Sequence, residues 1–303
     1  MKFSIVVTFP LGKKAEVLES IKKLDYPRKE IEILALPGPG SPSIYRNKGG
    51  EKGKGEIIAL IDDDAVVKKD LLKNAAKFFK KHKDIDIVGG PQLTPFDDRG
   101  FARISGYALS SRFGAWKTAN RYDGKKLNLN ADETMLTSAN LFCRKKVMKK
   151  VKFDEKLWPG EDPKFIDEAK KKGFKVAYSP DLIVYHRRRP TIKSLAKQIF
   201  KYGRVGPLRE KFSETLEKPS FLVPSIFVLY LLSLLVFIVI KIPYLNVLLI
   251  PGILYLSLDL AFSAYESIKN GDMAALFLLP FIFPLIHVSY GAGRIYGYLR
   301  VII

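Results

Sequence analysis

Three consecutive aspartates, Asp62, Asp63 and Asp64, close the apolar run Glu56–Ile61. A short β-branched run that ends in acids predicts a buried parallel strand, and open α/β sheets bind ligands at the C-terminal ends of such strands. Asp62 and Asp64 lie on the same side of an extended backbone, so both can approach one divalent cation. The alternative is a solvated acidic turn that caps the following helix.

Two further groups have side chains that suit the same chemistry. Glu161 and Asp162 follow Pro159-Gly160 at a predicted helix start and offer a general base, while His186 ends a predicted strand and offers a neutral metal ligand. The arginines that follow it can bind phosphate, and these are Arg187, Arg188 and Arg189. Each group alone is weak evidence, because acids often start helices and a lone histidine is often a bonded loop residue.

The elements that would position these groups alternate between strand and helix. Strands are predicted at 3–9, 31–36, 56–61 and 85–89, and helices at 13–24, 44–52 and 68–81. This order predicts a parallel sheet with helices on both faces. Residues 91–138 are expected to form loops and short helices that make an acceptor wall. Beyond them we expect strands at 138–144, 174–178 and 182–185, and a helix from Asp162 to Lys172.

The chain changes character at Pro219. Beyond that point lie only four of its 51 Lys and Arg and three of its 31 Asp and Glu. Uncharged runs at 221–240, 242–258 and 273–293 approach the length of roughly 20 residues that spans a bilayer, so three spans are predicted, with a re-entrant hairpin as the alternative for the middle one. The predicted domains are 1–190, an amphipathic helix and linker at 191–218, and a transmembrane part at 219–303.

The charge distribution indicates orientation and partners. The positive charges at 201–218 outnumber the single Lys241 beyond the first span, which predicts that the large domain lies in the cytoplasm of a multi-pass membrane protein. A net charge of +20 fits lipid or sugar phosphates beside membrane spans, and we expect no nucleic-acid partner because no such motif is visible. The helix at 191–212 presents lysines on one face, which favours a place among the headgroups of membrane lipids, with packing on the globular domain as the alternative. A lone Cys143 excludes an internal disulfide.

The order and spacing of these blocks resemble the family 2 glycosyltransferases over about residues 3–206. The matching blocks are Ile5-Val-Val-Thr-Phe-Pro10, Tyr45-Arg-Asn-Lys-Gly49, Gly55-Glu-Ile-Ile-Ala-Leu-Ile-Asp-Asp-Asp64, Ser138-Ala-Asn-Leu-Phe-Cys-Arg-Lys145, Phe153-Asp-Glu155, Gly160-Glu-Asp162 and Ala177-Tyr-Ser-Pro-Asp-Leu-Ile-Val-Tyr-His186. Two shorter stretches, Leu109–Gly114 and Gln198–Arg204, are similar to the membrane-bound branch that contains succinoglycan-type glucosyltransferases.

The resemblance implies a GT-A fold, which is Rossmann-like with a mostly parallel sheet, and inverting transfer of a sugar from a nucleotide-diphosphate donor. It implies that Asp64 and His186, with Asp62 beside them, hold Mn²⁺ or Mg²⁺, and that Asp162 is the base, supported by Glu161. The donor-binding residues that it implies are Thr8, Pro10, Arg46, Asp62 and Asp63. The basic residues Arg187, Arg188, Arg189 and Arg204 would meet phosphate, on the donor or on a lipid-linked acceptor such as a polyprenyl phosphate.

Several alternatives stay open at this point. The acidic turn that the family usually carries after its second strand is replaced by Leu36-Pro-Gly-Pro-Gly40, so the nucleotide is not identified. The Q-x-x-R-W block of processive polysaccharide synthases is imperfect here, which favours single transfer over polymerisation. A sugar nucleotidyltransferase would normally have a glycine-rich loop near Thr8–Lys14, where there is one glycine. A non-catalytic membrane adaptor or channel would use ionisable groups within the spans, such as Asp259 and His287.

Overall fold

The computed structural model describes residues 1–303 apart from 125, 211, 242 and 303, and it divides the chain into two compact units. The first contains Met1–Asp97 and Lys117–Arg187, and the second contains Asp98–Trp116 and Arg188–Ile303. The sequence predicted a boundary at residue 190, and the two compact units divide between Arg187 and Arg188. The stretch 98–116, expected within the first domain, belongs to the second unit, as does the helix expected at 191–212.

A six-stranded sheet in the order β2-β1-β3-β7-β5-β8 forms the centre of the first unit. The pairs β1–β2, β1–β3 and β5–β8 are parallel, whereas β7 runs antiparallel to β3 and β5. The mostly parallel sheet is therefore confirmed, with one reversed strand. Its strands are β1 (Phe3–Phe9), β2 (Ile31–Pro37), β3 (Ile57–Asp62), β5 (Ile87–Gly89), β7 (Asn140–Arg144) and β8 (Val176–Tyr178).

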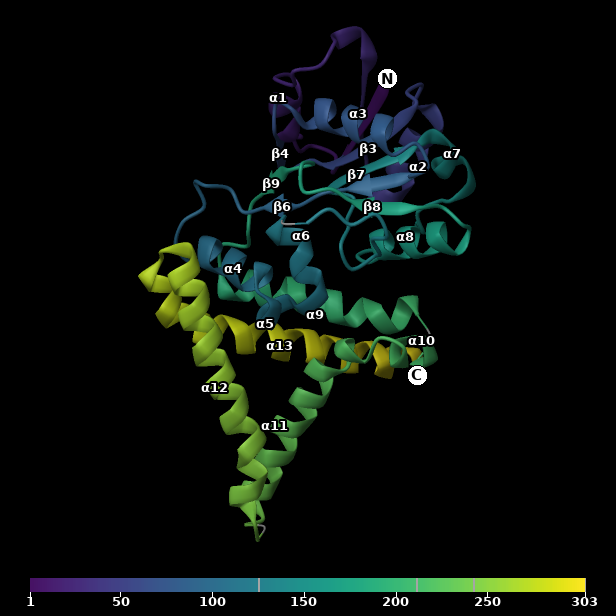
Figure 1. Ribbon diagram of the computed structural model, residues 1–303. Coiled ribbons are helices and arrows are strands. Elements are labelled where there is room, and N and C mark those ends of the chain that lie inside the picture. Colours follow the sequence, from purple (N-terminus) through teal and green to yellow (C-terminus); the bar gives the residue numbers. More distant parts are fainter. Residues whose placement is uncertain (125, 211, 242, 303) are drawn as a thin grey trace. The chain divides into compact units, whose positions relative to one another are not determined.

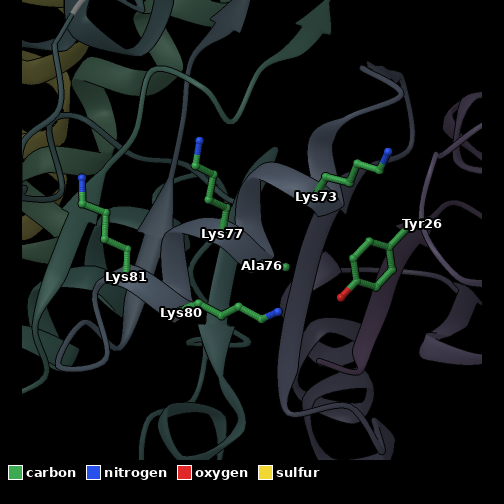
Figure 2. Close-up of a pocket in the computed structure, with 6 residues that line it drawn as sticks. All are labelled: Tyr26, Lys73, Ala76, Lys77, Lys80 and Lys81. Atoms are coloured by element: carbon green, nitrogen blue, oxygen red, sulfur yellow. The ribbon is translucent and has the colours of Figure 1, made fainter.

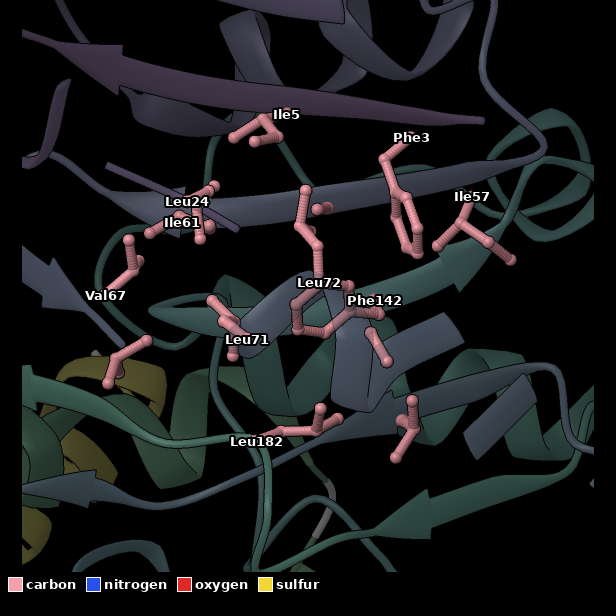
Figure 3. Close-up of a cluster of buried hydrophobic side chains, with 14 of the residues drawn as sticks. Phe3, Ile5, Leu24, Ile57, Ile61, Val67, Leu71, Leu72, Phe142 and Leu182 are labelled. Carbon is pink, nitrogen blue, oxygen red and sulfur yellow. The ribbon is translucent and has the colours of Figure 1, made fainter. Parts of the chain in front are cut away.

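Both faces of the sheet are covered at the central strands β1 and β3, whose successive side chains point to opposite faces and are nearly all buried, while the edge strand β2 is partly exposed. Ile5 of β1 and Ile61 of β3 join a core with Leu71 and Leu72 of α3, which Figure 3 shows between strands and helix. Val6 of β1 lies instead in a second core with side chains of α7 and α8. The helices of the unit are α1 (Val17–Ile21), α2 (Pro42–Lys52), α3 (Leu71–Lys81), α6 (Asn120–Asp123), α7 (Lys145–Lys150) and α8 (Glu161–Lys171).

A second, three-stranded sheet was not expected from the sequence. It consists of β4 (Ala65–Val67), β9 (Val184–His186) and β6 (Gln92–Leu93), in the order β4-β9-β6. Its antiparallel β4–β9 ladder places His186 opposite Ala65. Because Ala65 directly follows the three aspartates, this small sheet carries the distant His186 to the end of β3.

The second unit is helical. Its helices are α4 (Gly100–Ser110), α5 (Arg112–Ala115), α9 (Ile192–Arg209), α10 (Phe212–Leu216), α11 (Val223–Val239), α12 (Leu245–Asn270) and α13 (Met273–Ile302). Three of them, α11 to α13, are long and apolar enough to cross a membrane, as expected. α12 and α13 continue beyond the predicted spans, and Ile242, where the second span was predicted to begin, lies outside the described residues. Within this unit α9 and α13 lie side by side, while α11 and α12 descend from them and converge (Figure 1).

Glycines allow α9 and α13 to approach closely. A Cβ atom at Gly203 of α9 would overlap the carbonyl oxygen of Tyr290, and one at Gly293 of α13 would overlap that of Phe200. Leu195 and Ile199, on the same stripe of α9 as Gly203, are buried. The apolar stripe of this amphipathic helix therefore packs against α13 within the helical unit, whereas the sequence had offered the membrane interface or the globular domain as its partner.

We predict that Gly293→Leu destabilises the helical unit, because the new side chain meets rigid backbone and overpacking of this kind costs about 1–3 kcal/mol or more. The thermal midpoint of the full chain in detergent should fall by several degrees. Ala274→Leu is the control, since Ala274 is exposed on the same helix. Equal midpoints for the two variants would show that the close contact contributes nothing.

Candidate active site

The acidic motif and His186 meet at the C-terminal end of β3. Asp62 is the last residue of β3 and stands in register with Thr8 of β1. The Nε2 atom of His186 lies 3.0 Å from Oδ1 of Asp64 and 3.9 Å from Oδ2 of Asp62. One ligand atom from each of the three residues lies within 4.8 Å of the others. The three residues assigned to the metal from the sequence are thus brought together.

This arrangement has the chemistry of a divalent-cation site. Carboxylate oxygens and a neutral imidazole nitrogen suit Mn²⁺, and carboxylates with substrate phosphates suit Mg²⁺. The imidazole Nδ1 lies 3.2 Å from the carbonyl oxygen of Arg187, a contact that leaves Nε2 facing the two acids. The side chains of His186, Asp62 and Asp64 are 15%, 28% and 50% exposed, so the group opens to solvent on the side of Asp64.

Arg46 of α2 connects these acids to the pair at the start of α8. Its Nη2 lies 3.0 Å from Oδ1 of Asp62, and its Nη1 lies 2.7 Å from Oε1 of Glu161 and 3.3 Å from Oδ1 of Asp162. Burial alone lowers the pKa of the Arg46 guanidinium, but the three carboxylates outweigh it and raise the pKa above its usual value. Arg46 is therefore a fixed positive charge shared by three acids.

The helix that carries Arg46 is fastened by its neighbour Asn47. The Asn47 side chain donates to the carbonyl oxygen of Phe153 at 2.9 Å and accepts from the Phe153 amide at 2.9 Å. It also donates to Oε1 of Glu155 at 3.0 Å. The Phe153 ring lies 5.6 Å from the Arg46 guanidinium carbon. The loop before α8 and the helix α2 are thereby locked together beside the site.

Glu161 and Asp162 occupy different environments although they are adjacent. Burial, with a further contribution from the charge of Asp162, raises the pKa of Glu161 to about 7, and Arg46 opposes the shift. The Asp162 side chain is 17% exposed against 6% for Glu161, and its Oδ2 accepts a hydrogen bond from the Ser138 amide at 3.1 Å. Asp162 is thus the more exposed member of the pair, and its assignment as the base stays a prediction.

The residues assigned to the donor from the sequence, other than Arg46, lie at the ends of β1 and β3. Thr8 is buried next to Asp62 in the sheet, and Pro10 is exposed just beyond β1. Burial raises the pKa of Asp63 to about 6, with further contributions from Asp64 and Asp62. The backbone carbonyl of Asp63 accepts from the Val17 amide at 2.9 Å, which anchors the acidic turn to α1.

The predicted phosphate-binding arginines are divided between the units. Arg187 belongs to the first unit, where its Nη2 lies 2.6 Å from Oδ2 of Asp97. Arg188, Arg189 and Arg204 belong to the helical unit, in which the buried Arg188 donates its backbone amide to Asp98 at 3.0 Å. Phosphate binding by these four residues stays a prediction.

Two contributions to the site were not assigned from the sequence. They are the Ser138 amide that holds Asp162 and the Asn47 side chain that holds the loop at Phe153. The signal in the sequence that could have pointed to the Asn47 contact was the Arg46-Asn47 pair itself, because the chain also offers three acids that need a counter-charge. A separate hollow of about 600 Å³, lined by Tyr26 and four lysines of α3, shares no residue with this site (Figure 2).

Comparison with known proteins identifies the family. A sequence model described as "Glycosyltransferase like family 2" matches residues 1–203. The chain belongs to this family. The family 2 chain is 27% identical to the poly(ribitol-phosphate) β-N-acetylglucosaminyltransferase TarS of Staphylococcus aureus, over 27% of this chain and 19% of that protein. It is also 27% identical to an uncharacterised glycosyltransferase of Methanocaldococcus jannaschii, over 54% of this chain and 52% of the relative. The chain thus spans about a fifth of one relative and half of the other.

A solved structure supports the fold assignment. The mannosyltransferase PcManGT from Pyrobaculum calidifontis, in complex with GDP-mannose and Mn²⁺, matches with a TM-score of 0.58 and 12% sequence identity. The match covers 98% of this chain and 86% of that one. The expected GT-A fold is therefore confirmed for the family 2 chain.

We predict that Arg46→Ala strongly destabilises the sheet unit. Removing the shared cation leaves buried carboxylates unpaired, which costs about 3–5 kcal/mol. A drop of roughly 6–20 °C in the thermal midpoint is the expected scale for a domain of this size. Lys22→Ala removes an exposed pair with Glu19 and should change the midpoint little. If both variants melt alike, Arg46 does not hold the site together.

For the metal ligands, Asp64→Ala and His186→Ala should each abolish the gain in nucleoside-diphosphate affinity that Mn²⁺ confers on the wild type. We expect a gain of at least about tenfold, because the cation neutralises the diphosphate. Calorimetry with and without Mn²⁺ measures it. Asp84→Ala is the control, since Asp84 is an exposed acid paired with Lys175. If the wild type binds the nucleoside diphosphate with the same affinity in Mn²⁺ and in EDTA, the metal assignment is refuted.

Proposed function

We propose that this chain is a membrane-bound inverting glycosyltransferase. It moves a hexose from a nucleotide-diphosphate sugar to a lipid-linked acceptor, a polyprenyl phosphate or a saccharide carried on one, and it depends on Mn²⁺ or Mg²⁺. The observation that carries the proposal is the link through Arg46 between a cation-binding group, Asp62, Asp64 and His186, and an acid pair, Glu161 and Asp162. A cation beside a base is what transfer from a diphosphate requires.

The reaction would be a direct displacement. The acceptor hydroxyl loses its proton to Asp162 as its oxygen attacks C1 of the sugar, and the bond from C1 to the diphosphate oxygen breaks with its electron pair on the leaving group. A bound cation supplies positive charge to the departing diphosphate. Arg46 holds Asp162 through its Oδ1 while the Ser138 amide holds Oδ2, so the carboxylate is oriented on both oxygens.

A lipid-linked acceptor is favoured by the helical unit. Three of its helices are apolar enough to cross a membrane, which would hold the enzyme beside its acceptor. The excess of Lys and Arg before α11 over the single Lys241 after it favours a cytoplasmic catalytic unit. TarS, by its name, acts on a poly(ribitol phosphate), so a phosphate-bearing acceptor has a parallel among the relatives.

The experiment that tests this function uses membranes that contain the full chain. A panel of radiolabelled nucleotide sugars is offered with and without a native lipid extract, and products are separated by thin-layer chromatography. We expect one donor to label an organic-soluble product that mild acid hydrolyses. Label that passes only to water, or to a soluble alcohol as readily as to lipid, would contradict the lipid acceptor.

We predict that Asp162→Asn lowers turnover by about 10²–10⁴-fold, the range for loss of a general base, and leaves donor binding nearly unchanged. Asp167→Asn on the same helix is the matched control, because the Asp167 carboxylate is 37% exposed and lies 2.8 Å from Nζ of Lys171 one turn along the helix. Turnover and donor affinity are measured on the same preparations. More than a tenth of wild-type turnover in Asp162→Asn would exclude this residue as the base.

A further inference from the structure

The pairing of α9 with α13 restricts how the helical unit can enter a bilayer. The two helices run in the same direction, since Phe200 lies against Gly293 and, one turn later, Arg204 lies against Gly297. The Phe200 and Tyr296 rings are also in contact, with centroids 5.8 Å apart. The close contact is backbone to backbone, so one helix cannot be tilted into the membrane without the other.

α9 carries too many charges to cross a hydrocarbon core. Its 18 residues include five cations, Lys193, Lys197, Lys201, Arg204 and Arg209. Charged side chains within a bilayer are expensive and are almost always turned into a protein interior, whereas Lys193 and Lys197 are exposed. If α13 crossed the membrane, α9 would be carried through beside it. The pair must therefore lie along the surface.

A buried polar cluster extends this attachment past the end of α9. Arg294 of α13, which is 1% exposed, lies 2.9 Å from Oε1 of Glu210 and donates to Oγ1 of Thr215 at 2.8 Å. Tyr298 donates to the same Thr215 oxygen at 3.1 Å. An ion pair directly after the uncharged run 273–293 of α13 ties that helix to charged segments that precede α11, on the side where the membrane has not yet been entered.

α11 and α12 behave differently from α13. Both contact the middle of α13. Ser225 of α11 donates to the Gly291 carbonyl oxygen at 3.4 Å, and the Tyr255 hydroxyl of α12 lies 2.8 Å from Nδ1 of His287. Away from α13 they pair with each other, as Tyr230 donates to the Leu248 carbonyl oxygen at 2.9 Å. Figure 1 shows both helices leaving the α9–α13 pair and converging at the turn between them.

The lengths and charges of these two helices suit a crossing hairpin. α11 with its preceding turn forms an apolar segment of 21 residues, about 30 Å long and close to the thickness of the hydrocarbon core. The four cations after residue 219 are Lys241, Lys269, Arg294 and Arg300. Two crossings place all of them but Lys241 on the side where α11 starts, whereas three crossings would place Arg300 with Lys241. Positive charge is therefore biased more strongly to one side of the membrane with two crossings than with three, as the positive-inside rule favours.

We propose that only α11 and α12 cross the bilayer, as a hairpin with Lys241 at the far side, and that α13 lies with α9 along the lipid headgroups on the side of the sheet unit. Lipid hydrocarbon covers the exposed apolar surface of α11 and α12, and the headgroup layer covers the exposed surface of the α9–α13 pair. This topology is independent of the reaction that the enzyme performs.

Cysteine accessibility in sealed vesicles of one orientation tests this topology. The natural Cys143 is fully buried and is replaced by Cys143→Ser. Single cysteines are then introduced with Lys29→Cys on the sheet unit, Lys241→Cys at the hairpin turn and Arg300→Cys near the end of α13. Leu299→Cys, also at an exposed position, duplicates the last in case Arg300→Cys misfolds. A membrane-impermeant maleimide is added before or after permeabilisation.

We expect Lys29→Cys and Arg300→Cys to react from one side and Lys241→Cys from the other. Arg300→Cys and Leu299→Cys reacting together with Lys241→Cys would establish a third crossing and overturn the proposal. Lys241→Cys that reacts from the side of Lys29→Cys, or from neither side before solubilisation, would also overturn it, because the hairpin would then not cross. Monodisperse elution of each variant in detergent verifies that the comparison is made on folded protein.

Discussion

The guanidinium of Arg46 is the interaction on which the candidate site depends. It joins acids that come from the end of β3 and from the start of α8, about one hundred residues apart in the chain. Burial, and after it the charge of Asp162, already raises the pKa of Glu161 although Arg46 opposes the shift, and without this shared cation the carboxylates would repel one another more strongly and take up protons. Since both terminal nitrogens of Arg46 serve carboxylates, a donor diphosphate would have to find positive charge elsewhere, and the neighbouring cation-binding group is suited to supply it.

The sequence allowed much of the fold and the site to be predicted. The β1 strand was predicted at its observed bounds, and Asp62, Asp64 and His186 were grouped because the resemblance to family 2 glycosyltransferases implied a shared metal site. The partners of Arg46 were not predicted, since nothing local to α2 specifies that a helix residue will be buried against acids from α8. The reversed direction of β7 was missed for a related reason: four buried residues in a row read the same in either direction.

The helical unit shows where composition alone is insufficient. By length and hydropathy α13 resembles α11 and α12, yet it alone is bound along a helix with five cations. Placing one Lys or Arg at the centre of a membrane helix costs at least about 2.5–3.5 kcal/mol. The five cations of α9 therefore oppose a crossing by the α9–α13 pair more strongly than the apolar composition of α13 favours one. Such a decision depends on tertiary contacts between residues nearly one hundred positions apart, and a hydropathy window cannot detect them.

The glycines of α2 extend the influence of the site beyond its charged residues. Gly49 faces Val6 of the sheet and Gly50 faces Met148, each with no room for a Cβ atom unless that neighbour shifts. Both stand about one helical turn from Arg46, so the missing side chains set how closely the helix, and with it the guanidinium, approaches the strand ends. A methyl group at Gly49 would push α2 away from the sheet and so move Arg46 away from its acids, although the methyl group itself would touch none of them. The catalytic geometry of this enzyme is thus adjusted in part by the thickness of its hydrophobic core.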